Sequence, residues 1–133
     1  MGEREGRDEH FAWPDINDTA INRIDILKVI DIGPTAMGTR IHDTLNKVPE
    51  QRFCIHLDVD VVDQSIMPAV DCPAFPGLSA DDLVTIVTPL AADSRYLGTT
   101  VTVFDPDLDP EGLYASIIVD IPAQLPFSPR PDG

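Results

Sequence analysis

The chain has 133 residues, of which 43% are hydrophobic, and this length and composition suit one domain with a single core. Nine lysines and arginines stand against 23 aspartates and glutamates, so the formal net charge is −14. Nucleic acids and anionic membrane surfaces would repel a chain this acidic, so we expect neither as a partner. No apolar run approaches the roughly 18–20 residues that span a bilayer.

The ends of the chain and its thiols indicate where the protein works and how it is organised. Residues 1–20 are polar, contain no apolar run typical of a secretory signal, and predict an irregular N-terminal arm. Residues 126–133 are rich in proline and predict a flexible tail, which leaves residues 21–125 as the ordered domain. Two cysteines, Cys54 and Cys72, form no disulfide framework, so we expect reduced thiols and a cytoplasmic protein.

The first ordered elements follow from apolar spacing and from prolines. Apolar residues at 24–27 predict a short strand, which Gly33 and Pro34 separate from the next element. Helical spacing over 35–47 predicts an amphipathic helix. Residues 53–62 are rich in β-branched and aromatic side chains and predict a strand buried on both faces, as in parallel sheets.

The second half of the chain repeats the alternation of helices and strands. Residues 63–78 contain three prolines and a glycine, which predicts a long structured loop. Ser79, followed by acids, has the form of a helix N-cap. A β-rich run over 98–104 precedes a predicted helix over 111–121. We therefore expect an α/β fold whose sheet is mostly parallel.

Two carboxylates stand in the predicted strand of residues 53–62. Side chains alternate along a strand, so His56, Asp58 and Asp60 are expected on one face. Buried carboxylates are costly, and two of them repel each other, but a divalent cation would remove both penalties. Oxygen ligands favour Mn²⁺ or Mg²⁺, and a nearby histidine favours Mn²⁺. Asp58 and Asp60 are therefore candidate metal ligands at the carboxyl end of the strand.

Other interpretations of these residues stay open or are disfavoured. An Asp-x-Asp pair is also common in solvated loops, and His56 alternatively is a hydrogen-bonded core histidine. An aspartyl phosphotransferase is disfavoured because no lysine follows Lys47. Cys72 is disfavoured as a nucleophile because its surroundings are acidic. The acids that follow residue 104 lack the glycine and glutamate of a calcium loop, so we expect a solvated loop with a helix cap at Asp109.

The longer pattern resembles the signature of the arginase (ureohydrolase) family, S-F-D-x-D-x-x-D-P-x-x-x-P-x-x-G-T-P-x-x-G-G-L. The residues that match this signature at its spacing are Asp58, Asp60, Asp63, Pro68, Pro73, Gly77 and Leu78. The resemblance covers about residues 21–125 and corresponds to the second half of a family domain. It implies a three-layer α/β/α fold, incomplete in this chain.

The resemblance also implies chemistry and residue roles. Family members hold two Mn²⁺ ions, whose bridging hydroxide attacks the carbon of a small guanidino or amidino substrate. By position, Asp58 and Asp60 are metal ligands, Asp63 fixes the following loop, and Cys72 stands at a substrate-facing position. His56 then supports the ligands or has a structural role.

This sequence departs from the family pattern in its metal ligands and in one substrate position. The upstream His and Asp-x-His-x-Asp motifs are missing, and Val103 replaces the carboxylate that binds the guanidinium. Asp105 would face the same side as Val103 only if the strand continued to it. The chain is therefore expected to be part of a ureohydrolase-type enzyme with part of the manganese site, or a non-catalytic remnant acting through assembly. An incomplete sheet exposes an edge, so we expect a homo-oligomer or a complementing chain.

Overall fold

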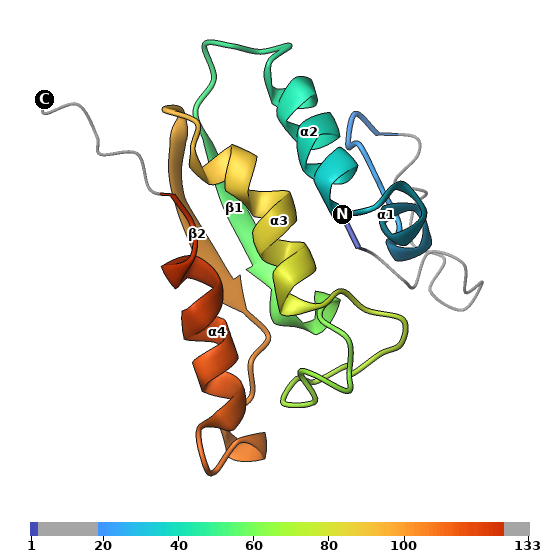
Figure 1. Ribbon diagram of the computed structural model, residues 1–133, viewed down its shortest axis with the longest axis vertical. Helices are drawn as coiled ribbons and strands as arrows, with labels where there is room; N and C mark the ends of the chain where they lie inside the picture. Colours follow the sequence, from blue (N-terminus) through green and yellow to red (C-terminus); the bar gives the residue numbers. More distant parts are fainter. Residues whose placement is uncertain (3–18, 127–133) are drawn as a thin grey trace, which may run out of the picture.

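A computed structural model of the chain describes residues 1–2 and 19–126. Two strands form a parallel sheet, and the helices pack beside it (Figure 1), which confirms the predicted α/β fold with a parallel sheet. The helices and strands in chain order are α1 (Ile26–Ile32), α2 (Pro34–Leu45), β1 (Phe53–Asp58), α3 (Ala80–Ala91), β2 (Tyr96–Thr102) and α4 (Leu113–Ala123). Short 3₁₀ turns at Val59–Val61 and Pro106–Leu108 follow the two strands.

The strand predicted at residues 24–27 is wrong, because a helix begins there. The Asp25 side chain accepts a hydrogen bond of 2.8 Å from the backbone N–H of Lys28 and caps α1. Ile26 and Val29, three residues apart, are buried on one side of this helix. The N-cap and the helical spacing outweigh the β-propensity of the isoleucines.

The helices predicted over 35–47, after Ser79 and over 111–121 are confirmed as α2, α3 and α4, with bounds shifted by one or two residues. Ser79 and Asp82 form a reciprocal capping box at the start of α3, with hydrogen bonds of 3.0 and 3.1 Å. Gly38 of α2 lies so close to α3 that a Cβ there would be 2.8 Å from the carbonyl oxygen of Ile86. A glycine is therefore needed where the two helices meet.

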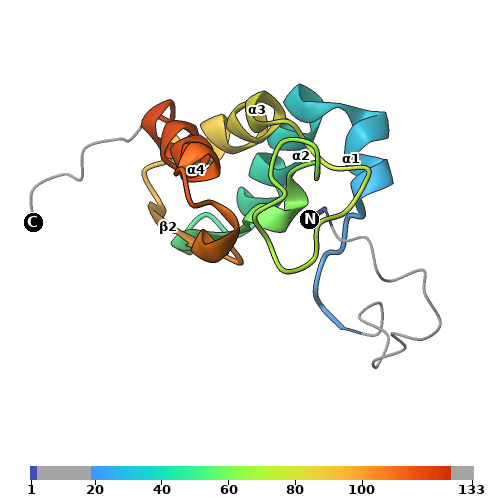
Figure 2. The ribbon, with the colours of Figure 1, turned by 90° about the horizontal axis from the view of Figure 1, so that it is seen from below.

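The strand predicted over 53–62 is shorter than expected and is not buried on both faces. It ends at Asp58, and its outward side chains Cys54, His56 and Asp58 are exposed. Figure 2 shows the helices on one side of the strands, so no described helix covers the other side. The second predicted strand, over 98–104, is observed two residues earlier as β2.

The first two residues lie against the domain. The backbone N–H of Gly2 donates a 2.8 Å hydrogen bond to the carbonyl oxygen of Ile24, and Gly2 is buried. Residues 3–18 of the predicted arm, and residues 127–133 of the predicted tail, lie outside the described residues. No described helix combines the length and the apolar character that crossing a membrane requires.

A charged cluster joins the end of α2 to the turn between α3 and β2. Arg95 donates to Asp93 Oδ2 at 2.6 Å, to Asn46 Oδ1 at 2.7 Å and to the carbonyl oxygen of Leu45 at 3.0 Å. His42 Nε2 lies 3.0 Å from the same Asp93 oxygen. The Arg95 side chain, by its hydrogen bonds, holds the pKa of the Asp93 carboxyl well below its usual range. Asp93 and Arg95 are two residues apart, but the sequence did not indicate their contacts with His42 and Leu45, which lie about fifty residues away.

Replacing Asp93→Asn should lower the free energy of unfolding at pH 7 by about 1–3 kcal/mol, since a largely buried carboxylate loses its charge-assisted hydrogen bonds to Arg95. The pKa of Asp93 is lower in the folded state than in the unfolded state, so its carboxylate stabilises the fold above about pH 4. That contribution is lost as the pH falls below this value. Urea unfolding from pH 7 to pH 3 should show the difference between wild type and variant shrinking.

The exposed Asp31, which pairs with Lys28 at 3.5 Å, provides the matched control for this measurement. Asp31→Asn should change the free energy of unfolding by less than about 0.5 kcal/mol. A difference between Asp93→Asn and wild type that stays constant with pH would contradict the assigned role of the charge.

Candidate functional site

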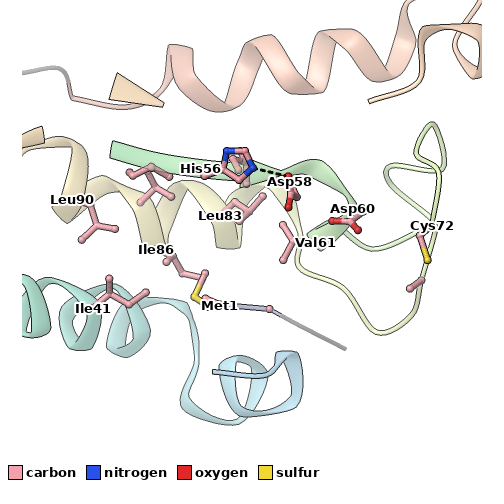
Figure 3. A pocket seen from close by; sticks show the side chains of 15 residues that line it. Met1, Ile41, His56, Asp58, Asp60, Val61, Cys72, Leu83, Ile86 and Leu90 are labelled. Carbon is pink, nitrogen blue, oxygen red and sulfur yellow. Dashed lines mark ion pairs between the residues drawn. The ribbon is translucent and has the colours of Figure 1, made fainter. Parts of the chain in front are cut away.

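A cavity of about 620 Å³ runs along the edge of β1 that faces away from β2 (Figure 3). Four consecutive residues of β1, 55–58, line it. Alternate side chains of a strand point to opposite faces, so a cavity lined by consecutive residues follows the edge of the strand. Apolar side chains of α2 and α3 form one wall, and His56, Asp58, Asp60 and Cys72 supply its polar groups.

The predicted metal ligands Asp58 and Asp60 both line this cavity, although the alternation argument for Asp60 is wrong. Asp58 is the last residue of β1, whereas Asp60 lies in the 3₁₀ turn that follows. The side chains of His56 and Asp58 are 62% and 49% exposed. Both side chains are exposed to water, so no cation is needed to offset a cost of burying their charge. The burial argument for a metal ion therefore no longer applies. The argument that is left is that Asp58 and Asp60 line the same cavity.

A hydrogen-bonded cluster across the two strands orients Asp58. The parallel register places His56 opposite Thr100 and Asp58 opposite Thr102. His56 Nδ1 lies 2.7 Å from Thr100 Oγ1, its Nε2 lies 3.2 Å from Asp58 Oδ1, and Thr102 Oγ1 donates to the same Asp58 oxygen. Sequence reasoning missed both threonines. Their spacing of two residues in a predicted strand was the available signal, but only the register shows which residues they face.

Asp63 ties together the two ends of the loop over residues 63–78. Its Oδ1 accepts hydrogen bonds from the backbone N–H and the hydroxyl of Ser65, at 3.0 and 2.7 Å. Its Oδ2 accepts from the backbone N–H of Gly77 at 3.0 Å. A Cβ on Gly77 would collide with the backbone of Asp63, so the loop closes only with glycine there. The closed loop carries Cys72 to the cavity.

The segment after β2 differs from the sequence expectation at two positions. Val103 has a φ of 76°, a strained conformation for a β-branched residue, and β2 ends before it. Asp105 therefore does not continue the strand, and its side chain instead accepts from the backbone N–H of Asp107 at 2.9 Å. Asp109 is 7% exposed, and its side chain accepts a 2.7 Å hydrogen bond from the backbone N–H of Ala115 in the first turn of α4, which agrees with its predicted capping role, although Gly112 is the N-cap residue.

The described side chains fit only part of a manganese centre. Across residues 1–2 and 19–126, no group of three or more histidine, cysteine, aspartate or glutamate side chains could hold a metal ion. Each Mn²⁺ ion needs several protein ligands, so Asp58 and Asp60 do not hold a two-ion centre by themselves. Further ligands would have to come from outside this set of residues.

The family model for the arginase family matches residues 1–125, and the chain therefore belongs to the arginase family. This match extends the motif-based resemblance, which began near residue 21, to the first residue. No curated protein matches the chain.

Solved structures with the same fold include three whose names bear on the site. The formimidoylglutamase of Bacillus subtilis has a TM-score of 0.74 and 20% identity, over 81% of this chain and 33% of that chain. The Entamoeba histolytica arginase, solved with L-ornithine, has a TM-score of 0.70 and 16% identity, over 84% and 37%. The Trypanosoma cruzi formiminoglutamase, solved with Mn²⁺, has a TM-score of 0.63 and 22% identity, over 76% and 32%. The chain thus has an arginase-like fold and spans about a third of the length of these relatives.

Replacing Gly77→Ala should destabilise the loop that carries Cys72, because the added methyl group meets the Asp63 backbone. We expect a loss of about 1–3 kcal/mol in the free energy of unfolding, as for other overpacked sites. Limited proteolysis should cut the loop faster in this variant.

Asp71→Ala changes an exposed residue of the same loop and serves as the control, with an expected change below about 0.5 kcal/mol. Equal cleavage rates and stabilities for the two variants would show that the Gly77 contact does not hold the loop.

Proposed function

We propose that this chain is part of a metal-dependent hydrolase that cleaves a C–N bond of a small guanidino or amidino substrate. In this proposal Asp58 and Asp60 are the contribution of the chain to a manganese site. The observation that carries it is the position of both carboxylates on one cavity, in a chain of the arginase family. With a complete set of ligands, Mn²⁺ would activate a water molecule as the nucleophile of the hydrolysis.

Charge and neighbouring residues support this assignment. Guanidino and amidino groups are cationic, and a chain of net charge −14 with acids at the cavity attracts cations. The Mn²⁺ in the related T. cruzi structure makes manganese the favoured ion for this site. Val103 offers no charge to a guanidinium, so we expect a substrate whose cationic group is held by other residues.

The remaining ligands in this proposal come from outside the described residues, either from another part of the polypeptide or from a complementing chain. Support comes from the length comparison, since about two thirds of each related chain has no counterpart here. The thiols Cys54 and Cys72 are both exposed and form no disulfide, which suits the reducing cytoplasm that we propose as the location.

A second candidate function is a non-catalytic remnant that acts through assembly with another chain. One observation favours it: the described residues contain no group of three metal-ligating side chains. Purified chain would then release no urea or related product from arginine, agmatine, guanidinobutyrate or formimidoylglutamate. Sustained turnover of any of these substrates by the chain alone would contradict the non-catalytic function.

Calorimetric titration with Mn²⁺ tests the proposed metal role of Asp58. We expect the wild-type chain to bind Mn²⁺ weakly, and Asp58→Asn to weaken binding at least roughly tenfold, because one of two carboxylates is neutralised. Asp71→Asn removes the same charge at an exposed residue outside the cavity lining and should leave binding unchanged. If all three proteins bind Mn²⁺ equally, the ion does not use Asp58.

A further inference from the structure

We propose that a polar groove on the outer side of α2 binds a small acidic amino acid, a molecule with two carboxylates and one ammonium group. The groove shares no lining residue with the cavity that Asp58 and Asp60 line. This site goes beyond the proposed function and does not depend on it. Three features carry it: the order of the charges along the groove, the hydrogen bonds of its threonines, and the acidity of the rest of the chain.

The groove lies along the side of α2 that faces away from α3. Its volume is about 360 Å³, and Arg40, Asp43 and Lys47 are among its lining residues. At about 3.6 residues per turn, these three residues point opposite to Gly38, which contacts α3. Asn22, from the segment before α1, also lines the groove. A space of this size admits a small molecule.

The charges along the groove alternate in sign. Arg40, Asp43 and Lys47 follow one another at spacings of three and four residues, so they are neighbours on one face of α2 and of the turn after it. Within residues 1–2 and 19–126, none of the three forms an ion pair. A positive, a negative and a positive group in a row complement a carboxylate, an ammonium group and a second carboxylate. An acidic amino acid presents its three charges in this order.

Two threonines in the groove supply acceptors for the ammonium group. The hydroxyl of Thr39 donates to the carbonyl oxygen of Thr35 at 3.2 Å, and the hydroxyl of Thr44 donates to the carbonyl oxygen of Arg40 at 2.9 Å. Each hydroxyl has one proton, so toward a ligand both oxygens can only accept. Together with the Asp43 carboxylate they offer acceptors to an ammonium group, whereas a dicarboxylate without an amino group gains nothing from them.

The acidity of the rest of the chain also favours a ligand with an ammonium group. Arg95 is the only lysine or arginine between residues 53 and 126, and the net charge of the whole chain is −14. This field repels a dicarboxylate, with its two negative charges, more strongly than an acidic amino acid, whose ammonium group cancels one of them. Arg40 and Lys47, set against Asp43 alone, make the groove locally positive.

A nuclear magnetic resonance titration of the isotope-labelled chain tests the site. L-Glutamate is the probe, and glutarate, which has the same two carboxylates and lacks the ammonium group, is the matched control. We expect glutamate to shift the amide signals of Asn22 and of residues 36–47. Its affinity should be at least about threefold higher than that of glutarate, as expected for one added exposed ion pair.

Three results of this titration would overturn the proposal. The first is that glutamate leaves the amide signals of the groove unshifted. The second is that glutarate binds as tightly as glutamate, since the ammonium group would then have no role. The third is that inorganic phosphate binds as tightly as glutamate, which would make the groove a general site for anions.

Exposed side chains of the groove allow variants that leave the core intact. Asp43→Asn should weaken glutamate binding about threefold without weakening glutarate binding, so the preference for glutamate disappears. Lys47→Gln should weaken both ligands about threefold. Lys28→Gln makes the same change at an exposed residue outside the groove lining and should alter neither affinity. A preference for glutamate that survives Asp43→Asn would contradict the proposed contact of the ammonium group.

A variant of the cavity separates this site from the proposed metal site. Asp58→Asn removes a proposed ligand of Mn²⁺ and should bind glutamate as the wild type does, because Asp58 does not line the groove. Loss of glutamate binding in this variant would place the ligand in the cavity and overturn the groove as its site.

Discussion

The parallel pairing of β1 with β2 is the constraint on which the rest of the structure depends. Its register sets His56 against Thr100 and Asp58 against Thr102, and so builds the polar cluster at the carboxyl end of the sheet. The same pairing uses one edge of β1 and leaves the other edge facing the cavity. Site and open edge therefore arise from one set of backbone hydrogen bonds.

Around this pair of strands, local devices hold the segments that have no regular structure. Asp63 closes the loop that carries Cys72, and Asp109 caps α4 after the turn that follows β2. Arg95 and Asp93 join the end of α2 to the turn before β2 by charge-assisted hydrogen bonds. In each case a carboxylate accepts from backbone N–H groups or from a guanidinium, which stabilises a bend that apolar contacts alone would leave loose.

The chain carries the fold of its family without the full length of its relatives. A parallel sheet normally buries both faces. In the part of the chain that the structure describes, however, the side chains of His56 and Asp58 are exposed to solvent. The exposed face and the open edge of β1 fit a chain that spans about a third of the length of its relatives.

Much of the fold could be predicted from the sequence, because it depends on local chemistry. Helical spacing and the Ser79 cap placed α2 and α3, β-branched runs placed both strands, and the spacing of Asp58, Asp60 and Asp63 indicated the family. These signals lie within a few residues of one another, so they can be recognised without knowing the contacts. The strand expected at residues 24–27 failed where an aspartate cap outweighed β-propensity.

Only the tertiary structure decided which residues meet across the chain. Thr100 lies 44 residues from its partner His56, and Asp93 lies 51 residues from its partner His42. No local pattern encodes the register or the helix contact that brings these pairs together. The exposure of Asp58 was also unpredictable, since burial depends on which layers cover a strand and not on the strand itself. Local sequence thus determined the elements, and their packing determined the site, because distant contacts form only when the whole sheet and its helices assemble.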